Sequence, residues 1–80
     1  MILVEIFVPA VNRKQDFKLD ENAYIADIIS EVGTMIFGGE DTANVIENLI
    51  LCDDTQHRVL ALDQTLGENN IRSGDRLLLI

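Results

Sequence analysis

The chain contains one cysteine and one histidine, Cys52 and His57, which lie close together with the acids Asp53 and Asp54 between them. A thiol nucleophile needs a nearby imidazole base, and a strand followed by a turn could bring these two side chains together. A cysteine that ends a strand is more commonly a small core side chain, and a histidine in a polar turn is commonly solvated. We therefore interpret Cys52 as structural and His57 as exposed, and we expect no enzymatic activity.

Other polar groupings are equally weak as reactive centres. Cys52 and His57 lack the second spaced ligand pair of a zinc site, and nothing spaces further oxygen ligands around Asp53 and Asp54. The stretch Gly38-Gly39-Glu40-Asp41 resembles the signature of diguanylate cyclases, whose domain is much longer, and is better explained by a helix end followed by solvated acids. No Gly-rich phosphate loop of standard spacing is present. We predict neither a metal nor a cofactor.

Length and charge argue against further classes of protein, such as multidomain and nucleic-acid-binding proteins. Eighty residues suffice for a single domain, 1–80, and a net charge of −8 disfavours nucleic acid, which is bound by clustered Lys and Arg. Only Arg13, Lys14 and Lys18 approach such a cluster. A lone cysteine favours a reducing compartment, and no apolar run is long enough for membrane insertion or placed as in a signal peptide. We expect a cytoplasmic protein.

Hydrophobic patterning predicts the elements that would position any site. Apolar and β-branched runs predict strands at 2–8, 13–19, 49–52, 58–61 and 76–80. One helix is predicted from a stripe at helical spacing, formed by Ile25, Ile28, Ile29, Val32 and Ile36. Asn22 is expected to cap this helix and Gly38 to end it, whereas residues 40–47 suit either a short second helix or a loop. Residues 63–70 suggest a single helical turn.

This order of elements has few three-dimensional solutions. One helix packed across one face of a mixed sheet of four to five strands is a two-layer α+β arrangement. Both the first and the last predicted strands are strongly apolar, so we place them side by side in the middle of the sheet. The result is the β-grasp plan.

The run from Thr65-Leu66 through Ile71 to the turn before the last strand resembles the final third of ubiquitin-like domains. More narrowly, Ile71-x-x-Gly74-Asp75-Arg76-Leu77 near the end of the sequence resembles the YukD or EsaB family, small ubiquitin-like proteins of bacterial type VII secretion systems. The resemblance covers essentially the whole chain except 38–48, which does not match. It implies a cytosolic accessory protein whose partner is a component of the secretion apparatus.

The last residues separate two kinds of ubiquitin-like protein. Modifiers and sulfur carriers need a flexible Gly-Gly tail whose carboxylate enters an activating enzyme, whereas Leu79 and Ile80 lie inside a predicted strand. We therefore expect a non-conjugating interaction module. The alternative is a modifier or sulfur carrier whose Gly-Gly tail is missing from this chain.

Strand alternation predicts where a partner would bind. If Glu5 and Arg76 face water, an apolar patch forms on the open face of the sheet, rimmed by Lys14, Lys18 and Arg76. Its members are Leu3, Phe7, Leu78 and Ile80. Either Ile50 or Leu49 of the third predicted strand extends it, and we take Ile50 as the site residue. An apolar patch of this kind marks a protein partner or self-association. The alternative is that bulges shift the alternation, or that residues 40–47 cover the patch.

Overall fold

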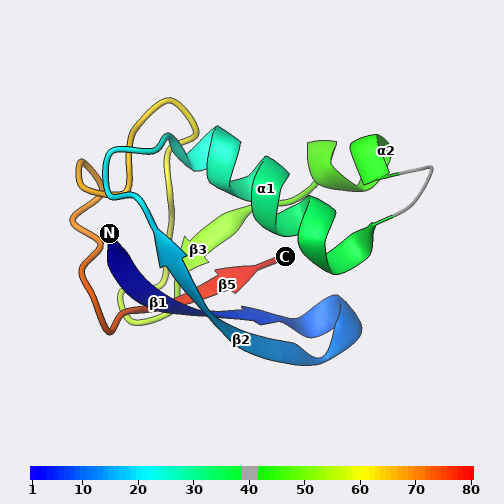
Figure 1. The fold of residues 1–80 in the computed structure, drawn as a ribbon, viewed down its shortest axis with the longest axis horizontal. Helices are drawn as coiled ribbons and strands as arrows, with labels where there is room; N and C mark the ends of the chain where they lie inside the picture. The colour runs from blue at the N-terminus through cyan, green and yellow to red at the C-terminus, as the bar shows by residue number, and fades with distance from the viewer. Residues whose placement is uncertain (39–41) are drawn as a thin grey trace.

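The computed structural model describes residues 1–38 and 42–80, with the side chains of 42–44 outside that description. The elements, in chain order, are β1 (Ile2–Val8), a 3-10 turn (Pro9–Val11), β2 (Arg13–Leu19), α1 (Ile25–Phe37), α2 (Thr42–Glu47), β3 (Leu51–Asp53), β4 (Arg58–Val59) and β5 (Arg76–Leu79). Both helices lie on the same side of one sheet (Figure 1). The predicted two-layer α+β arrangement is confirmed.

The sheet has five strands in the order β2-β1-β5-β3-β4. β1 pairs antiparallel with β2 and parallel with β5, and β5 pairs antiparallel with β3. The last strand therefore lies beside the first in the middle of the sheet, as predicted. Because β5 is central, its inward side chains Leu77 and Leu79 are fully buried.

α1 buries the predicted apolar stripe. Ile25, Ile28, Ile29 and Val32 are buried against the sheet, whereas Ile36 is half-buried near the end of the helix. A helix with apolar side chains at this spacing gains stability mainly from such packing. Gly38 ends the helix as predicted, with its backbone N–H donating to the Thr34 carbonyl at 3.1 Å. The rest of the Gly38-Gly39-Glu40-Asp41 motif, residues 39–41, lies outside the described residues.

The predicted capping of α1 by Asn22 is wrong. The helix begins at Ile25 after Tyr24, with no side-chain cap, and the Asn22 backbone N–H instead donates to Asp20 Oδ1 at 2.9 Å. The first helical N–H groups are satisfied by the chain between β4 and β5. Ile25 donates to the Gln64 carbonyl at 2.9 Å, and Ala26 donates to the Leu62 carbonyl at 3.2 Å.

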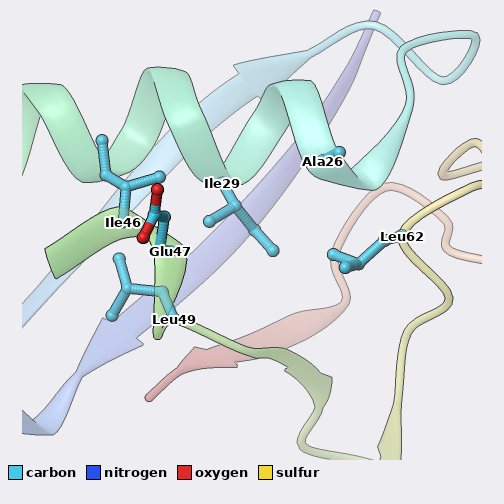
Figure 2. A pocket seen from close by; sticks show the side chains of 6 residues that line it. All are labelled: Ala26, Ile29, Ile46, Glu47, Leu49 and Leu62. Atoms are coloured by element: carbon cyan, nitrogen blue, oxygen red, sulfur yellow. The ribbon is translucent and has the colours of Figure 1, made fainter. Parts of the chain in front are cut away.

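Residues 40–47, for which the sequence allowed either a short helix or a loop, contain α2. This short helix packs beside α1 at Gly33, where a methyl group would lie only 2.9 Å from Ile46 Cγ1 and 3.3 Å from Leu49 Cδ1. Glycine therefore permits the close approach of the two helices. Figure 2 shows Ile46 and Leu49 on the α2 side of a small gap whose other wall includes Ile29.

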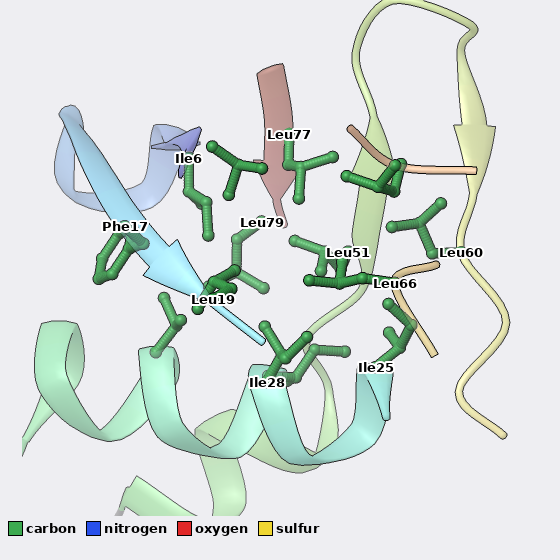
Figure 3. Close-up of a cluster of buried hydrophobic side chains, with 14 of the residues drawn as sticks. Ile6, Phe17, Leu19, Ile25, Ile28, Leu51, Leu60, Leu66, Leu77 and Leu79 are labelled. Carbon is green, nitrogen blue, oxygen red and sulfur yellow. The ribbon is translucent and has the colours of Figure 1, made fainter. Parts of the chain in front are cut away.

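A single cluster of buried side chains joins the helical layer to the sheet. In Figure 3, Ile25 and Ile28 of α1 point toward Leu51 and Leu79 of the sheet. β3 begins two residues later than predicted because the Leu49 N–H closes α2 by donating to the Ile46 carbonyl at 3.1 Å. β4 and β5 are shorter than predicted. The single helical turn predicted within 63–70 is present as a turn at 66–70, where the Asn69 N–H donates to the Thr65 carbonyl at 3.1 Å.

Candidate functional site

The face of the sheet away from the helices carries the predicted patch residues. In β1, Val4, Ile6 and Val8 are buried, so the alternating Leu3 and Phe7 project to the open face, where Leu3 is 45% exposed and Phe7 is half-buried. The same alternation places Leu78 outward between buried Leu77 and Leu79. Leu3, Phe7 and Leu78 therefore point to the open face, as the sequence predicts.

The register of four strands aligns apolar side chains into one row. Phe7 pairs with Leu78, Leu78 pairs with Cys52, and Cys52 pairs with Val59. These four residues, which we call the apolar row, cross the open face from β1 to β4. Val59 is 65% exposed, although it was not among the predicted site residues. Counting alternate residues from Ile50 would have placed Cys52 on this face, whereas Val59 is found only from the register that pairs it with Cys52.

Ile50 and Ile80 extend the apolar row along the adjacent strands. Their backbones exchange two hydrogen bonds, from Ile50 N to Ile80 O at 2.6 Å and from Ile80 N to Ile50 O at 2.9 Å. Each lies two residues from a member of the row, Cys52 or Leu78, so both side chains face the same way. They are 43% and 50% exposed, respectively. The structure therefore brings together Phe7, Ile50, Leu78 and Ile80.

Leu3 is separated from the other patch residues. Asp16, Glu5 and Arg76 are in register across β2, β1 and β5, and this charged row lies between Leu3 and Phe7. The predicted patch is thus split, with Leu3 on the far side of the charges.

The basic groups predicted at the rim occupy two different positions. Lys14 pairs with Phe7, and Lys18 pairs with Leu3, so both lie on the outer strand β2 and are exposed. Arg76 stands on the central strand β5, within the open face. The apolar row is therefore bordered by cationic side chains at its β2 end and along its Arg76 side.

Cys52 does not form an activated thiol with His57. Its strand partner is Val59, and burial raises the pKa of the Cys52 thiol. Nucleophilic cysteines need the opposite shift. His57 is exposed, as expected, in the turn between β3 and β4. The interpretation of Cys52 as a core side chain is also wrong, because it is half-buried on the open face.

Asp53 lies at the end of β3 and is buried, whereas the neighbouring Asp54 is exposed. Asp53 is 2% exposed, and its Oδ1 accepts hydrogen bonds from the backbone N–H groups of Thr55 at 3.0 Å and Gln56 at 3.4 Å. Arg58 Nε lies 3.8 Å from Asp53 Oδ2, and the same guanidinium donates to the carbonyl of buried Asn69. This polar cluster fixes the β3–β4 turn against the long connection to β5. These contacts give Asp53 a structural role.

Within residues 1–38 and 42–80, no group of three or more metal-ligating side chains is placed to hold an ion. No helix in the described part of the chain is long and apolar enough to cross a bilayer.

The sequence matches no protein-family model and no curated protein. Solved structures give a clearer result. Ubiquitin from Caldiarchaeum subterraneum is similar with a TM-score of 0.77 and 20% identity, over 99% of this chain and 90% of that one. This chain has the ubiquitin-like β-grasp fold.

Two further ubiquitin-like structures agree. A ubiquitin-like domain of an Arabidopsis thaliana protein has a TM-score of 0.76 and 14% identity, over 99% of this chain and 74% of that chain. A de novo designed protein based on ubiquitin has a TM-score of 0.74 and 20% identity, over 99% of this chain and 85% of that chain. At these sequence identities, the similarity to ubiquitin-like structures shows a shared fold and nothing more.

Proposed function

We propose that the chain is a non-conjugating ubiquitin-like module that binds a protein partner, or a second copy of itself, through the open face of its sheet. The observation that carries this proposal is the apolar row, Phe7, Leu78, Cys52 and Val59, which Ile50 and Ile80 extend on the open face. The exposed part of this row is unfavourable in water. A partner that covers it removes that apolar area from solvent.

The arrangement has the features of a binding surface. Apolar residues lie at the centre, and Lys14 and Arg76 stand beside them, where a partner's acidic groups would fix orientation. Burying each large side chain contributes about 1.5 to 3 kcal/mol before the costs of association. Phe7, Ile50, Leu78 and Ile80 would make the main contacts, and Leu3 a peripheral one.

We further propose that the partner belongs to a type VII secretion apparatus and that the module acts in the cytoplasm. The resemblance of Ile71-x-x-Gly74-Asp75-Arg76-Leu77 to the YukD or EsaB family supports this assignment. In the fold, this motif forms the turn into β5. Gly74 has a φ of +96° and donates its N–H to the Leu3 carbonyl at 2.8 Å, and the Asp75 carbonyl accepts from the Glu5 N–H at 3.1 Å.

A charge placed in the apolar row tests the proposal. Phe7→Asp should retain the circular dichroism spectrum and lose both self-association and co-purification with secretion components from a secretion-competent host. Met35→Asp is the matched control, because Met35 is 65% exposed on α1. Unfolding of Phe7→Asp would assign Phe7 to the core, and undiminished binding would show that the open face is not the docking surface.

A modifier or sulfur carrier is the second candidate, favoured by the likeness to a ubiquitin. It requires a Gly-Gly tail after Ile80, whose backbone is hydrogen-bonded to Ile50. The intact mass of the protein purified from its native host separates the two candidates, because conjugation or a terminal thiocarboxylate adds a defined mass.

A further inference from the structure

A small cavity lies on the helical side of the molecule, between α1, α2 and the chain after β4. Its volume is about 190 Å³, and it is lined by Ala26, Ile29, Ile46, Glu47, Leu49 and Leu62 (Figure 2). We call it the helix-side cavity. Sites for small molecules usually enclose about 300 to 1,000 Å³, whereas a cavity of about 150 Å³ accommodates benzene. The helix-side cavity therefore suits one large apolar side chain.

The surroundings of the helix-side cavity are acidic. No lysine or arginine occurs between Lys18 and Arg58, a stretch that includes both helices. Glu47 itself lines the cavity, and the exposed acids Asp27 and Asp63 directly follow the lining residues Ala26 and Leu62. The complementary ligand is therefore basic.

Leu62 marks where the ligand would enter. It lines the cavity yet is 56% exposed, so part of its apolar surface remains in water. The backbone hydrogen bond from Ala26 to the Leu62 carbonyl, at 3.2 Å, holds this wall against the first turn of α1. A side chain inserted beside Leu62 would cover it and reach Ile29 and Leu49 behind.

We propose that the helix-side cavity is a second docking site, which takes one large apolar side chain from a partner's peptide segment whose flanking residues are Lys or Arg. The apolar anchor fills the space between Ala26, Ile46 and Leu62, and the flanking cations meet Glu47 and the neighbouring acids. This site is separate from the apolar row on the sheet. It does not depend on what binds there.

Short synthetic peptides with one variable central residue and flanks of Lys, Ser or Glu provide the probe. Peptides with Leu, Ile, Met or Phe between lysines should bind, and their affinity should fall with added salt. Serine flanks should weaken binding about tenfold, and glutamate flanks should abolish it. The amide NMR signals that shift should be those of Ala26, Ile29 and the other lining residues.

Two variants and one control complete the test. Ala26→Leu extends an exposed helical side chain into the cavity and should reduce binding of the Lys-flanked Leu peptide about tenfold or more. Glu47→Lys should weaken binding through charge alone, without filling the space. Phe7→Asp, on the opposite face, should bind this peptide as the wild type does, so failure of this site and failure of the sheet-face proposal are distinguishable.

Several outcomes would overturn the proposal. Equal binding of Glu-flanked peptides would remove its electrostatic basis. Wild-type affinity in folded Ala26→Leu and Glu47→Lys, or amide shifts confined to β1 and β5, would place the peptide elsewhere. Concentration-dependent shifts of the lining residues without peptide would identify a second copy of the chain as the occupant instead.

Discussion

Gly33 of α1 and Ile46 of α2 pack so closely that an added methyl group at Gly33 would lie 2.9 Å from Ile46 Cγ1. This contact sets the position of α2 beside α1. It therefore also sets the width of the helix-side cavity.

We predict that Gly33→Ala destabilises the protein although alanine is the better helix former. The propensity gain is about 1 kcal/mol, whereas the forced displacement of Ile46 costs typically about 1 to 3 kcal/mol. Thermal denaturation should show a lower Tm. Ser30→Ala, at an exposed position of α1, should leave Tm unchanged or raise it, and a Tm increase in Gly33→Ala would show that α2 gives way freely.

The split of the predicted patch leads to a ranking of its members. Phe7→Ala should weaken partner binding by about 10- to 100-fold, which corresponds to losing the burial of one large side chain. Leu3→Ala should change it by about threefold or less, because peripheral contacts contribute little. Isothermal titration with the identified partner measures both. Equal losses would mean that the partner spans the charged row of Asp16, Glu5 and Arg76.

Asp53 and its neighbour Asp54 should differ sharply in their effect on stability. Asp53→Ala removes the acceptor for two turn N–H groups and the partner of Arg58, so we expect a loss of about 1 to 3 kcal/mol in the free energy of unfolding. Asp54→Ala, at an exposed position, should change it by about 0.5 kcal/mol or less. Urea denaturation compares the two, and similar values would contradict a structural role for Asp53.

The thiol of Cys52 should report on occupancy of the open face. Because burial raises its pKa, less thiolate is present at a given pH, and alkylation should be slower in the native protein than in the urea-unfolded chain. A bound partner that covers Leu78 and Val59 should slow it further. Alkylation of the native protein as fast as that of the unfolded chain would contradict the first expectation. An alkylation rate that a saturating partner does not change would contradict the second.

Acid should weaken one exposed ion pair. The Met1 amino group lies 3.1 Å from Glu21 Oε2, and its hydrogen bond, followed by a backbone hydrogen bond and Coulomb attraction, holds the pKa of Glu21 below its ordinary value. Since the folded-state pKa is the lower one, this contribution is present at neutral pH and is lost as the pH falls through it. The acid-induced drop in Tm should be smaller in Glu21→Gln than in the wild type. Glu31→Gln, on α1, is the control and should follow the wild type.

Periodic features of the sheet and of α1 were predictable from the sequence. Alternation in β1 and β5 places Phe7 and Leu78 outward, and the spacing of Ile25, Ile28 and Val32 places the helix stripe inward. Both depend on local geometry that every strand and helix shares. For the patch, alternation likewise predicted which side chains point to the open face.

The missed features depend on contacts between distant segments. Nothing near Asn22 indicates that the carbonyls of Leu62 and Gln64 will satisfy the start of α1. The burial of Asp53 requires Arg58 to lie beside it while the same guanidinium donates to the Asn69 carbonyl, and the separation of Leu3 from Phe7 requires the register of three strands. Sequence patterns give the direction of a side chain, but its neighbours come from tertiary pairing.

The parallel pairing of β1 with β5 has a consequence for synthesis. Phe7 of β1 leaves the ribosome well before Leu78 of β5, so the two cannot stand side by side until β5 has also emerged. A nascent or prematurely stopped polypeptide would present Phe7 without its neighbour. Recognition through this surface would therefore distinguish a domain that already contains β5 from one in which β5 has not yet been made.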